Sequence, residues 1–202
     1  MEAFSSFEAI GVPIDIPNCD TDQIIPARFL RHLPEDGSYH KYLFHDLRFD
    51  GDGTEREDFI FNREPYRQGK IVVADLNWGC GSSRENAVYA LVANGIRCVI
   101  APSFGDIHYN NCMQHGVLPV VLPRAVCDGL RAALHETPGA RVHVDLATQT
   151  VRAPDGASHR FDIAPFDKHK LLNGLDDIAL TRAYDAQFEA FEERHARAYD
   201  WL

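Results

Sequence analysis

A polar, glycine-rich stretch between two apolar runs constrains this chain more than any other feature. The stretch covers residues 75–86, and the run before it, residues 71–74, is short and β-branched, which is typical of a buried strand. The run after it, residues 87–93, has helical periodicity and ends at a stop signal, Asn94-Gly95. Its expected buried face holds Ala87, Val88, Leu91 and Val92. The sequence therefore predicts a strand, a tight turn at its carboxyl end, and a helix.

Further apolar runs predict an α/β fold with a mixed sheet and flanking helices. Residues 96–101 have the pattern of a second buried strand, which with residues 71–74 forms a parallel β-loop-α-β unit. Other strands are expected over residues 7–16, interrupted at Pro13, over 117–122, where Pro119 indicates an edge or a bulge, and over 142–146 and 151–153 as a hairpin. Helices are expected around residues 106–115 and 125–134.

The chain is expected to form one domain over residues 1–202 that ends in an amphipathic helix over about 176–198. Its length of 202 residues suits a single core. In the final segment an apolar stripe recurs at helical spacing among charged residues and consists of Leu180, Tyr184, Phe188 and Phe191. Such a stripe must be buried, either on the chain's own core or on a partner.

Charge and hydropathy exclude several classes of function. The net charge is −10, from 20 Lys and Arg against 30 Asp and Glu, so the chain should repel nucleic acid and anionic membranes. No apolar run approaches the roughly 18 residues that span a bilayer. The first residues, 1–6, lack the basic and apolar regions of a signal peptide, and a cytoplasmic location is therefore expected.

The cysteines argue against a disulfide framework and against a metal centre. There are five, an odd number with no C-x-x-C spacing: Cys19, Cys80, Cys98, Cys112 and Cys127. Neither zinc nor an iron–sulfur cluster is therefore expected on this chain alone. Cys98 lies in an apolar run and is expected in the core, whereas Cys80 lies in the glycine-rich turn.

Two polar regions precede the turn. Asp20 and Asp22 lie in a segment rich in turn-forming residues, and turn formation is the favoured interpretation of both. Residues 31–70 are polar and irregular. The acidic sequence at 50–54 fails as a calcium loop because Phe61 stands where a bidentate glutamate is required, so it is expected to be a turn.

The turn itself has a structural and a functional interpretation. Ser82 and Glu85 have the spacing of a capping box, in which the serine only starts a helix. The glycines, the place at the end of a buried strand and Arg84 beside a helix N-terminus favour an anion site instead. A dinucleotide site lacks its third glycine, a P-loop its lysine and a lipase elbow its last glycine. A lone arginine suits a small carboxylate ligand.

Four segments carry a resemblance to a known family: residues 18–30, 79–85, 101–107 and 173–178. With them, the chain resembles the small subunits of 3-isopropylmalate dehydratase in the aconitase superfamily over nearly its whole length. The resemblance implies a swivelling β/β/α domain that closes over a large subunit carrying a 4Fe-4S cluster. It implies a hydro-lyase that is active only with that subunit and interconverts 2- and 3-isopropylmalate through isopropylmaleate, in leucine biosynthesis.

The resemblance also assigns roles to residues of the turn. Ser82 is the base that removes the carbon-bound proton, Arg84 holds a substrate carboxylate, and Ser83 supports it. Gly79 and Gly81 shape the turn, and the segment that begins at Arg31-His32 tunes specificity for the substrate side chain. Two positions depart from the family pattern: Asn86 stands where histidine is usual, and Cys19 where an apolar residue is usual.

Two alternatives remain open from the sequence. A related hydro-lyase could act on citramalate or homocitrate, and the loop from Arg31 to Arg48 would decide the substrate. The chain could also be a carboxylate-binding module without catalysis, in which Ser82 is only a helix cap.

Overall fold

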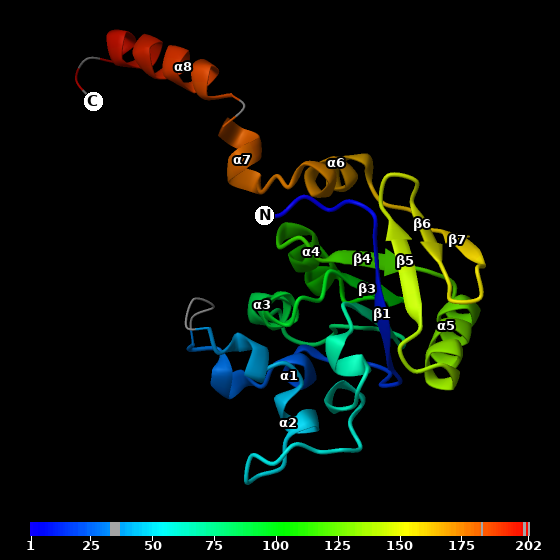
Figure 1. Cartoon of the computed structure of the whole chain (residues 1–202). Coiled ribbons are helices and arrows are strands. Elements are labelled where there is room, and N and C mark those ends of the chain that lie inside the picture. The colour runs from blue at the N-terminus through cyan, green and yellow to red at the C-terminus, as the bar shows by residue number, and fades with distance from the viewer. Residues whose placement is uncertain (33–36, 183, 200, 202) are drawn as a thin grey trace.

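A curled, mixed sheet of seven strands organises the chain in the order β4-β3-β2-β1-β5-β6-β7 (Figure 1). The computed structural model describes residues 1–32, 37–182, 184–199 and 201. The first four strands pair in parallel and the last three extend the sheet in antiparallel fashion. The strands are β1 (Phe7–Ile14), β2 (Ile71–Ala74), β3 (Cys98–Ala101), β4 (Leu118–Val121), β5 (Arg141–Asp145), β6 (Thr150–Arg152) and β7 (Ser158–Arg160).

The parallel strands are buried on both faces because helices cover both. Successive residues of β2 enter opposite cores: Ile71 and Val73 pack beside α5, and Val72 and Ala74 pack beside α3. This explains why β2 is a continuous apolar run rather than an alternating one. The helices are α1 (Thr21–Ile24), α2 (His45–Arg48), α3 (Glu85–Ala93), α4 (Asp106–Gln114), α5 (Arg124–Glu136), α6 (Pro165–Asn173), α7 (Asp177–Arg182) and α8 (Asp185–Ala198).

The expected α/β architecture is confirmed, including the parallel β2-α3-β3 unit and the β5–β6 hairpin. Pro119 lies in β4, which forms one edge of the sheet, as expected. Pro13 does not interrupt β1, so the interruption predicted from the sequence was wrong. β5 pairs with β1 only over residues 7–10, and Pro13 pairs on one side, with Val73, so its missing N–H is tolerated.

Three other expectations need correction. Val92 is 42% exposed, and Ala90 takes its place on the buried face of α3. The irregular region 31–70 contains short helices, η3 (Tyr39–Lys41), α2, η4 (Ile60–Asn62) and η5 (Tyr66–Gln68), besides the expected turn at 50–54. The strand β7 and the helix α6 were not predicted, since three- and nine-residue elements of mixed polarity give little periodic signal.

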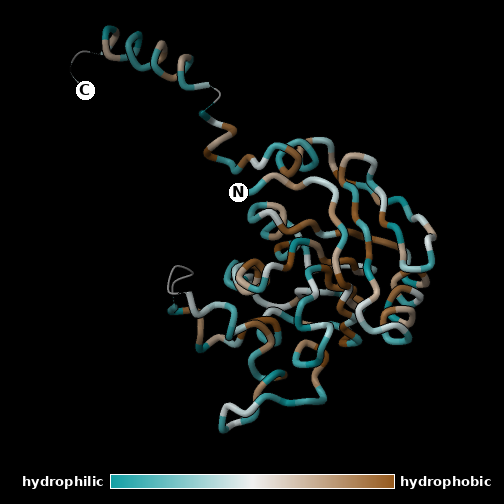
Figure 2. The backbone as a smooth tube through the Cα atoms, viewed as in Figure 1, coloured by the Kyte–Doolittle hydropathy of each residue, from teal (hydrophilic) through white to brown (hydrophobic). Residues whose placement is uncertain are grey.

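The expected C-terminal helix over about 176–198 is two helices, α7 and α8. Tyr184 lies between them with φ −108° and ψ 9°, outside helical geometry. Neither helix contains a buried residue. Figure 1 shows α8 projecting away from the sheet and its helices, and Figure 2 shows apolar positions recurring along it. In the described part of the chain, no helix is long and apolar enough to cross a membrane.

Candidate active site

The glycine-rich turn is held by the two segments that continue the neighbouring strands. Beyond β1, Cys19 accepts a hydrogen bond from the Gly79 amide at 2.7 Å, and the Thr21 amide donates to Cys80 at 3.0 Å. Beyond β3, Ser103 accepts from the Trp78 amide at 3.0 Å, and the Gly105 amide donates to the Trp78 carbonyl at 2.8 Å. The turn is thus pinned on both sides at the carboxyl edge of the sheet, which is where open α/β sheets bind ligands.

The two glycines serve different physical needs. Both have positive φ, +70° at Gly79 and +89° at Gly81, which glycine adopts at little cost. A Cβ at Gly79 would lie 2.2 Å from Cδ2 of His108, whereas the nearest atom to a Cβ at Gly81 is 3.4 Å away, on Asp20. Glycine at position 79 therefore allows the close approach of the His108 ring, whereas glycine at position 81 is needed only for its positive φ.

Ser82 is not a helix cap in the structure. Helix α3 begins at Glu85, its N-cap residue is Arg84, and that residue makes no side-chain capping bond. The Ser82 carbonyl accepts a hydrogen bond of 2.7 Å from Oγ1 of Thr21. Both Ser82 and Ser83 are exposed, and neither hydroxyl has a hydrogen-bond partner among the residues described. Two free hydroxyls therefore stand beside an uncapped helix N-terminus.

Arg84 is paired with a carboxylate from the N-terminal segment. Both of its terminal nitrogens donate to Asp22, one of them to Oδ2 at 2.7 Å, although the two residues are 62 positions apart. The Arg84 side chain is 12% exposed and the Asp22 side chain is 56% exposed. Hydrogen bonds from Arg84 lower the pKa of Asp22 below its usual value. The fork that suits a carboxylate is thus already filled by one in this chain.

Asp20 and Asp22 have separate tasks. The Asp20 carboxylate accepts a hydrogen bond from the Gln23 amide at 2.8 Å, and the Gln23 side chain accepts one from the Asp20 amide at 3.0 Å. This capping box starts α1, so the turn interpretation is correct for Asp20. For Asp22 it is incomplete, because the side chain points to Arg84. Asp22 is thus the carboxylate that pairs with Arg84, while Asp20 borders the turn through its bridge with Cys80.

The segment at Arg31-His32 is joined to α3 by a hydrogen-bonded relay. Asn86 donates to Oη of Tyr39 at 2.5 Å, and that hydroxyl donates to the His32 carbonyl at 3.1 Å. Tyr39 is buried, whereas Arg31 and His32 are both exposed, and residues 33–36 lie outside the described part. Asn86, one of the two positions that depart from the pattern expected from the resemblance, therefore links α3 to the candidate specificity segment through Tyr39, which is also in ring contact with Tyr89 of α3.

Sequence reasoning missed His108, which lies directly beneath the turn. Its side chain is 3% exposed, and neither ring nitrogen has a hydrogen-bond partner among the described residues. Burial lowers its pKa from 6.5 to about 4. His108 lies in α4, three residues after Gly105. This position and the positive φ of Gly79 bring the His108 ring into contact with the turn. No local sequence pattern distinguishes this histidine from a surface one.

The burial of His108 predicts a loss of stability in acid. The unfolded chain binds this proton below pH 6.5 and the folded chain only below about 4, so stability is complete above 6.5 and falls between these values. From pH 7 to pH 5, wild type should lose about 2 kcal/mol more unfolding free energy than His108→Leu in urea titrations. His169→Leu, at an exposed histidine of α6, is the control and should retain the wild-type dependence. Equal losses in wild type and His108→Leu would contradict this.

The cysteines do not form a metal site. Cys19, Cys98, Cys112 and Cys127 are buried, and Cys80 is half-buried with its Sγ 3.4 Å from the Asn18 carbonyl. Burial raises the pKa of Cys19 to about 12, so this thiol stays protonated. Within the ranges the structure describes, no three His, Cys, Asp or Glu side chains are grouped to hold a metal ion. Cys98 lies in the core, as expected.

The turn is an open surface rather than a closed pocket. A cavity of about 780 Å³ lies between α5 and the β5–β6 hairpin, and its walls include Glu136, Arg141 and Arg152 but none of the predicted site residues. Ser82 and Ser83 are exposed at the sheet edge instead, beside the mostly buried side chain of Arg84. A ligand held at the two serines would therefore be exposed to solvent on this chain alone.

Comparison with known proteins gives the class and then the family. The model of the aconitase C-terminal domain matches residues 1–125, and a second model, described as LeuD_N, matches residues 128–165. A crystal structure of 3-isopropylmalate dehydratase (LeuD) from Methanocaldococcus jannaschii superposes with a TM-score of 0.66 at 24% identity, covering 92% of this chain and 99% of that one. Fold and turn thus define an aconitase-type C-terminal domain.

Full-length relatives identify the family within this class. The 3-isopropylmalate dehydratase small subunit of Gluconobacter oxydans is 48% identical over 199 residues, which cover 98% of this chain and 95% of the relative. That of Parvibaculum lavamentivorans is 45% identical over 202 residues, the full length of both. This chain belongs to the family of 3-isopropylmalate dehydratase small subunits.

Proposed function

We propose that this chain is the small subunit of isopropylmalate isomerase and supplies one half of an active site that a large subunit completes. The enzyme dehydrates 2-isopropylmalate to isopropylmaleate and rehydrates it to 3-isopropylmalate, in leucine biosynthesis, and a cytoplasmic location belongs to the same proposal. The full-length identity of 45–48% to small subunits supports this function. The observation that carries the mechanism is the open turn, where free serine hydroxyls stand beside an arginine fork.

In this mechanism Ser82 removes the carbon-bound proton. A neutral serine is too weak a base, so its alkoxide must be stabilised. Helix α3 has no side-chain cap, and its first amide groups therefore remain donors beside the turn. The positive charge of Arg84, two residues on, favours the same oxyanion. Glycines at positions 79 and 81 allow the backbone of the turn to approach the substrate.

Arg84 holds a carboxylate of the substrate, with Ser83 as an additional hydrogen-bond donor. A planar guanidinium binds a carboxylate through two parallel hydrogen bonds, which fixes its orientation as well as its place. The bond to Asp22 already has this form, so a substrate carboxylate would take over an existing geometry. The Asn86–Tyr39–His32 relay would set the position of the segment at Arg31-His32, which we assign to side-chain specificity.

A 4Fe-4S cluster on the large subunit belongs to the proposal. When bound, such a cluster supplies a Lewis acid for the departing hydroxyl. Four of the five cysteines of this chain are buried, and among the described residues no three His, Cys, Asp or Glu side chains are grouped to hold a metal ion, which supports placing the cluster on the other subunit. Its own contribution is to bind and orient the substrate carboxylate and to move a proton at Ser82.

The test mixes the purified chain with its cluster-loaded large subunit and follows isopropylmaleate by its absorbance. Turnover of 2-isopropylmalate is expected only when both subunits are present, and it should exceed turnover of citramalate and homocitrate supplied at the same concentration. A preference for either of these would assign the chain to a related hydro-lyase. Substrate binding without turnover by an intact complex would leave only a carboxylate-binding role.

A further inference from the structure

An aromatic stripe runs along the C-terminal helix α8 and is exposed throughout. Tyr184, Phe188 and Phe191 recur at spacings of four and three residues, which puts them on one helical face, and Tyr199 and Trp201 follow just after the C-terminal end of α8. Their exposed fractions lie between 45% and 72%: Tyr184 54%, Phe188 50%, Phe191 53%, Tyr199 45% and Trp201 72%. Exposed aromatic groups of this extent mark an interaction surface.

The chain's own body does not cover this stripe. No residue of α7 or α8 is buried, and Figure 1 shows α8 standing clear of the sheet and the helices that flank it. The ring contacts that the stripe makes lie within the helix or at its end, Phe191 with His195 and His195 with Tyr199. We call α7 and α8 the C-terminal arm.

The composition of α8 favours a helix that awaits a partner. Asp185 lies in its first turn, while His195 and Arg197 lie in its last, an arrangement that suits the helix dipole. Arg197 also pairs with Glu193 at 3.0 Å. A helix of 14 residues is marginal alone in water, and its stability in proteins comes from packing of an apolar face.

The size of the stripe decides against a second copy of this chain as the main occupant. Five half-exposed aromatic side chains offer on the order of 100 Å² each, or about 500 Å² together. A stable interface buries about 800 Å² on each partner. The arm alone falls short of this, so it fits a surface that adds to a larger interface with another protein.

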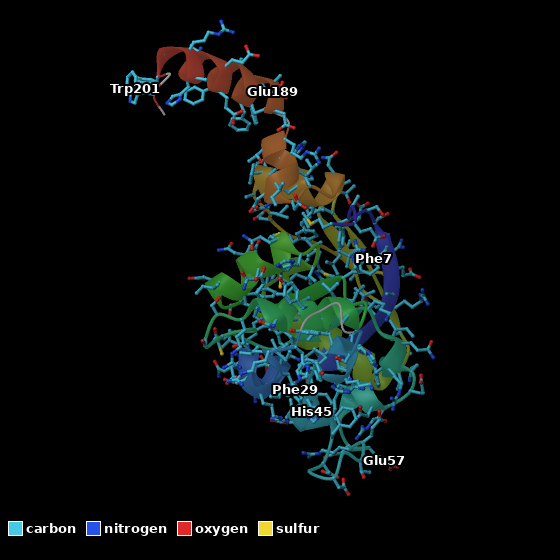
Figure 3. All side chains as sticks on the ribbon, turned by 90° about the vertical axis from the view of Figure 1, so that its left-hand side faces the viewer. Phe7, Phe29, His45, Glu57, Glu189 and Trp201 are labelled. Carbon is cyan, nitrogen blue, oxygen red and sulfur yellow. The ribbon has the colours of Figure 1, made fainter. Side chains whose placement is uncertain are left out.

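The position of the arm indicates which protein forms this larger interface. In Figure 1 the arm leans toward the side on which α3 lies, and Figure 3, which looks at that side, shows Phe29 and His45 on it below the arm. Both belong to the segments that surround the Arg28–Asp46 ion pair, next to the candidate specificity segment. A partner that covers this side of the molecule can therefore reach the arm as well.

We propose that the C-terminal arm docks on the large subunit, with the aromatic stripe of α8 seated in an apolar groove that has a basic rim. The rim follows from the charges that flank the stripe, since Asp185, Glu189, Glu192 and Glu193 outnumber Arg194 and Arg197. The proposal rests on the proposed function, which supplies the large subunit. It adds a tether that holds the subunits together at a distance from the turn.

The test compares the full-length double variant Phe188→Ser/Phe191→Ser with wild type for binding to the large subunit, measured by titration calorimetry. The dissociation constant should rise roughly tenfold to a hundredfold, because buried aromatic anchors carry much of an interface's energy. Ala186→Ser/Ala190→Ser, at two exposed uncharged positions on the face of α8 opposite the stripe, is the matched control and should stay within about twofold of wild type. Urea unfolding of the body should be the same in all three, because neither Phe188 nor Phe191 packs on its core.

The outcomes separate this proposal from the function on which it rests. A wild-type complex with full turnover and an unchanged dissociation constant for the phenylalanine variant would overturn the docking of the arm alone. A wild-type chain that dimerises in light scattering and becomes monomeric in that variant would assign the stripe to a second copy and overturn it equally. Failure of the wild-type chain to bind the large subunit would overturn the proposed function.

Discussion

With Ser82 replaced by alanine, the complex with the large subunit should assemble normally and turn over about a thousandfold more slowly. The expected loss is in kcat, because the substitution removes the proposed base and leaves the carboxylate fork of Arg84 intact. Assembly should be unaffected, because the Ser82 hydroxyl is exposed and has no hydrogen-bond partner in the described part of the chain. Steady-state rates of isopropylmaleate formation at saturating substrate measure the effect.

The neighbouring serine provides the matched control for this experiment. Ser83 is also exposed and lies one residue closer to Arg84, but its proposed role is a single hydrogen bond. Ser83→Ala should therefore cost only about tenfold in kcat/KM, the value of one hydrogen bond to a charged group. If Ser82→Ala retained more than about a tenth of the wild-type kcat, the base would have to be sought on the other subunit.

Replacing Gly79 with alanine should both unfold the chain more easily and abolish turnover. The new Cβ would lie 2.2 Å from Cδ2 of His108, whose side chain is buried. Together with the cost of φ +70° for a side chain, this overlap should lower the unfolding free energy by about 3 kcal/mol. Urea titration of the isolated chain measures this loss without the partner.

Two further variants separate overlap from backbone strain. Gly81→Ala imposes a similar positive φ, +89°, but brings its Cβ no closer than 3.4 Å to a neighbour, so it should cost only about 1 kcal/mol. His108→Ala should relieve the overlap, so that Gly79→Ala costs clearly less in that background. Equal losses at the two glycines in the wild-type background would show that packing against His108 does not restrict the turn.

The sequence predicted the elements that position the site because their patterns are local. Residues 71–74 form a strand since they are β-branched and bounded by polar residues, and the run to Ala93 forms a helix since its apolar positions repeat at helical spacing. The interruption expected at Pro13 was wrong because the cost of a proline depends on which edge of the strand is paired. That pairing is a property of the sheet, not of the segment.

The contacts within the site could not be predicted, because they join distant parts of the chain. Asp22 and Arg84 meet only because β1 and β2 are parallel neighbours, so that the segments after both strands leave the same edge of the sheet. Tyr39 reaches Asn86 from a region without periodicity. The roles of Ser82, Ser83 and Arg84 came from the resemblance and stay predictions.

The Asp22–Arg84 pair has a consequence for the order of events in assembly. A lone guanidinium that a partner covers loses its hydration without compensation, which costs several kcal/mol, whereas a paired one brings its counter-charge with it. In the separate subunit the Asp22 carboxylate occupies the position at Arg84 that a carboxylate ligand would take. The charge of Arg84 is therefore neutralised before a partner binds. If Arg84 binds a substrate carboxylate as proposed, admission of the substrate becomes an exchange of one carboxylate for another. The free chain is therefore expected to bind a carboxylate ligand weakly, because the ligand must displace Asp22 from Arg84. Small subunits in excess over their partner would then sequester little substrate.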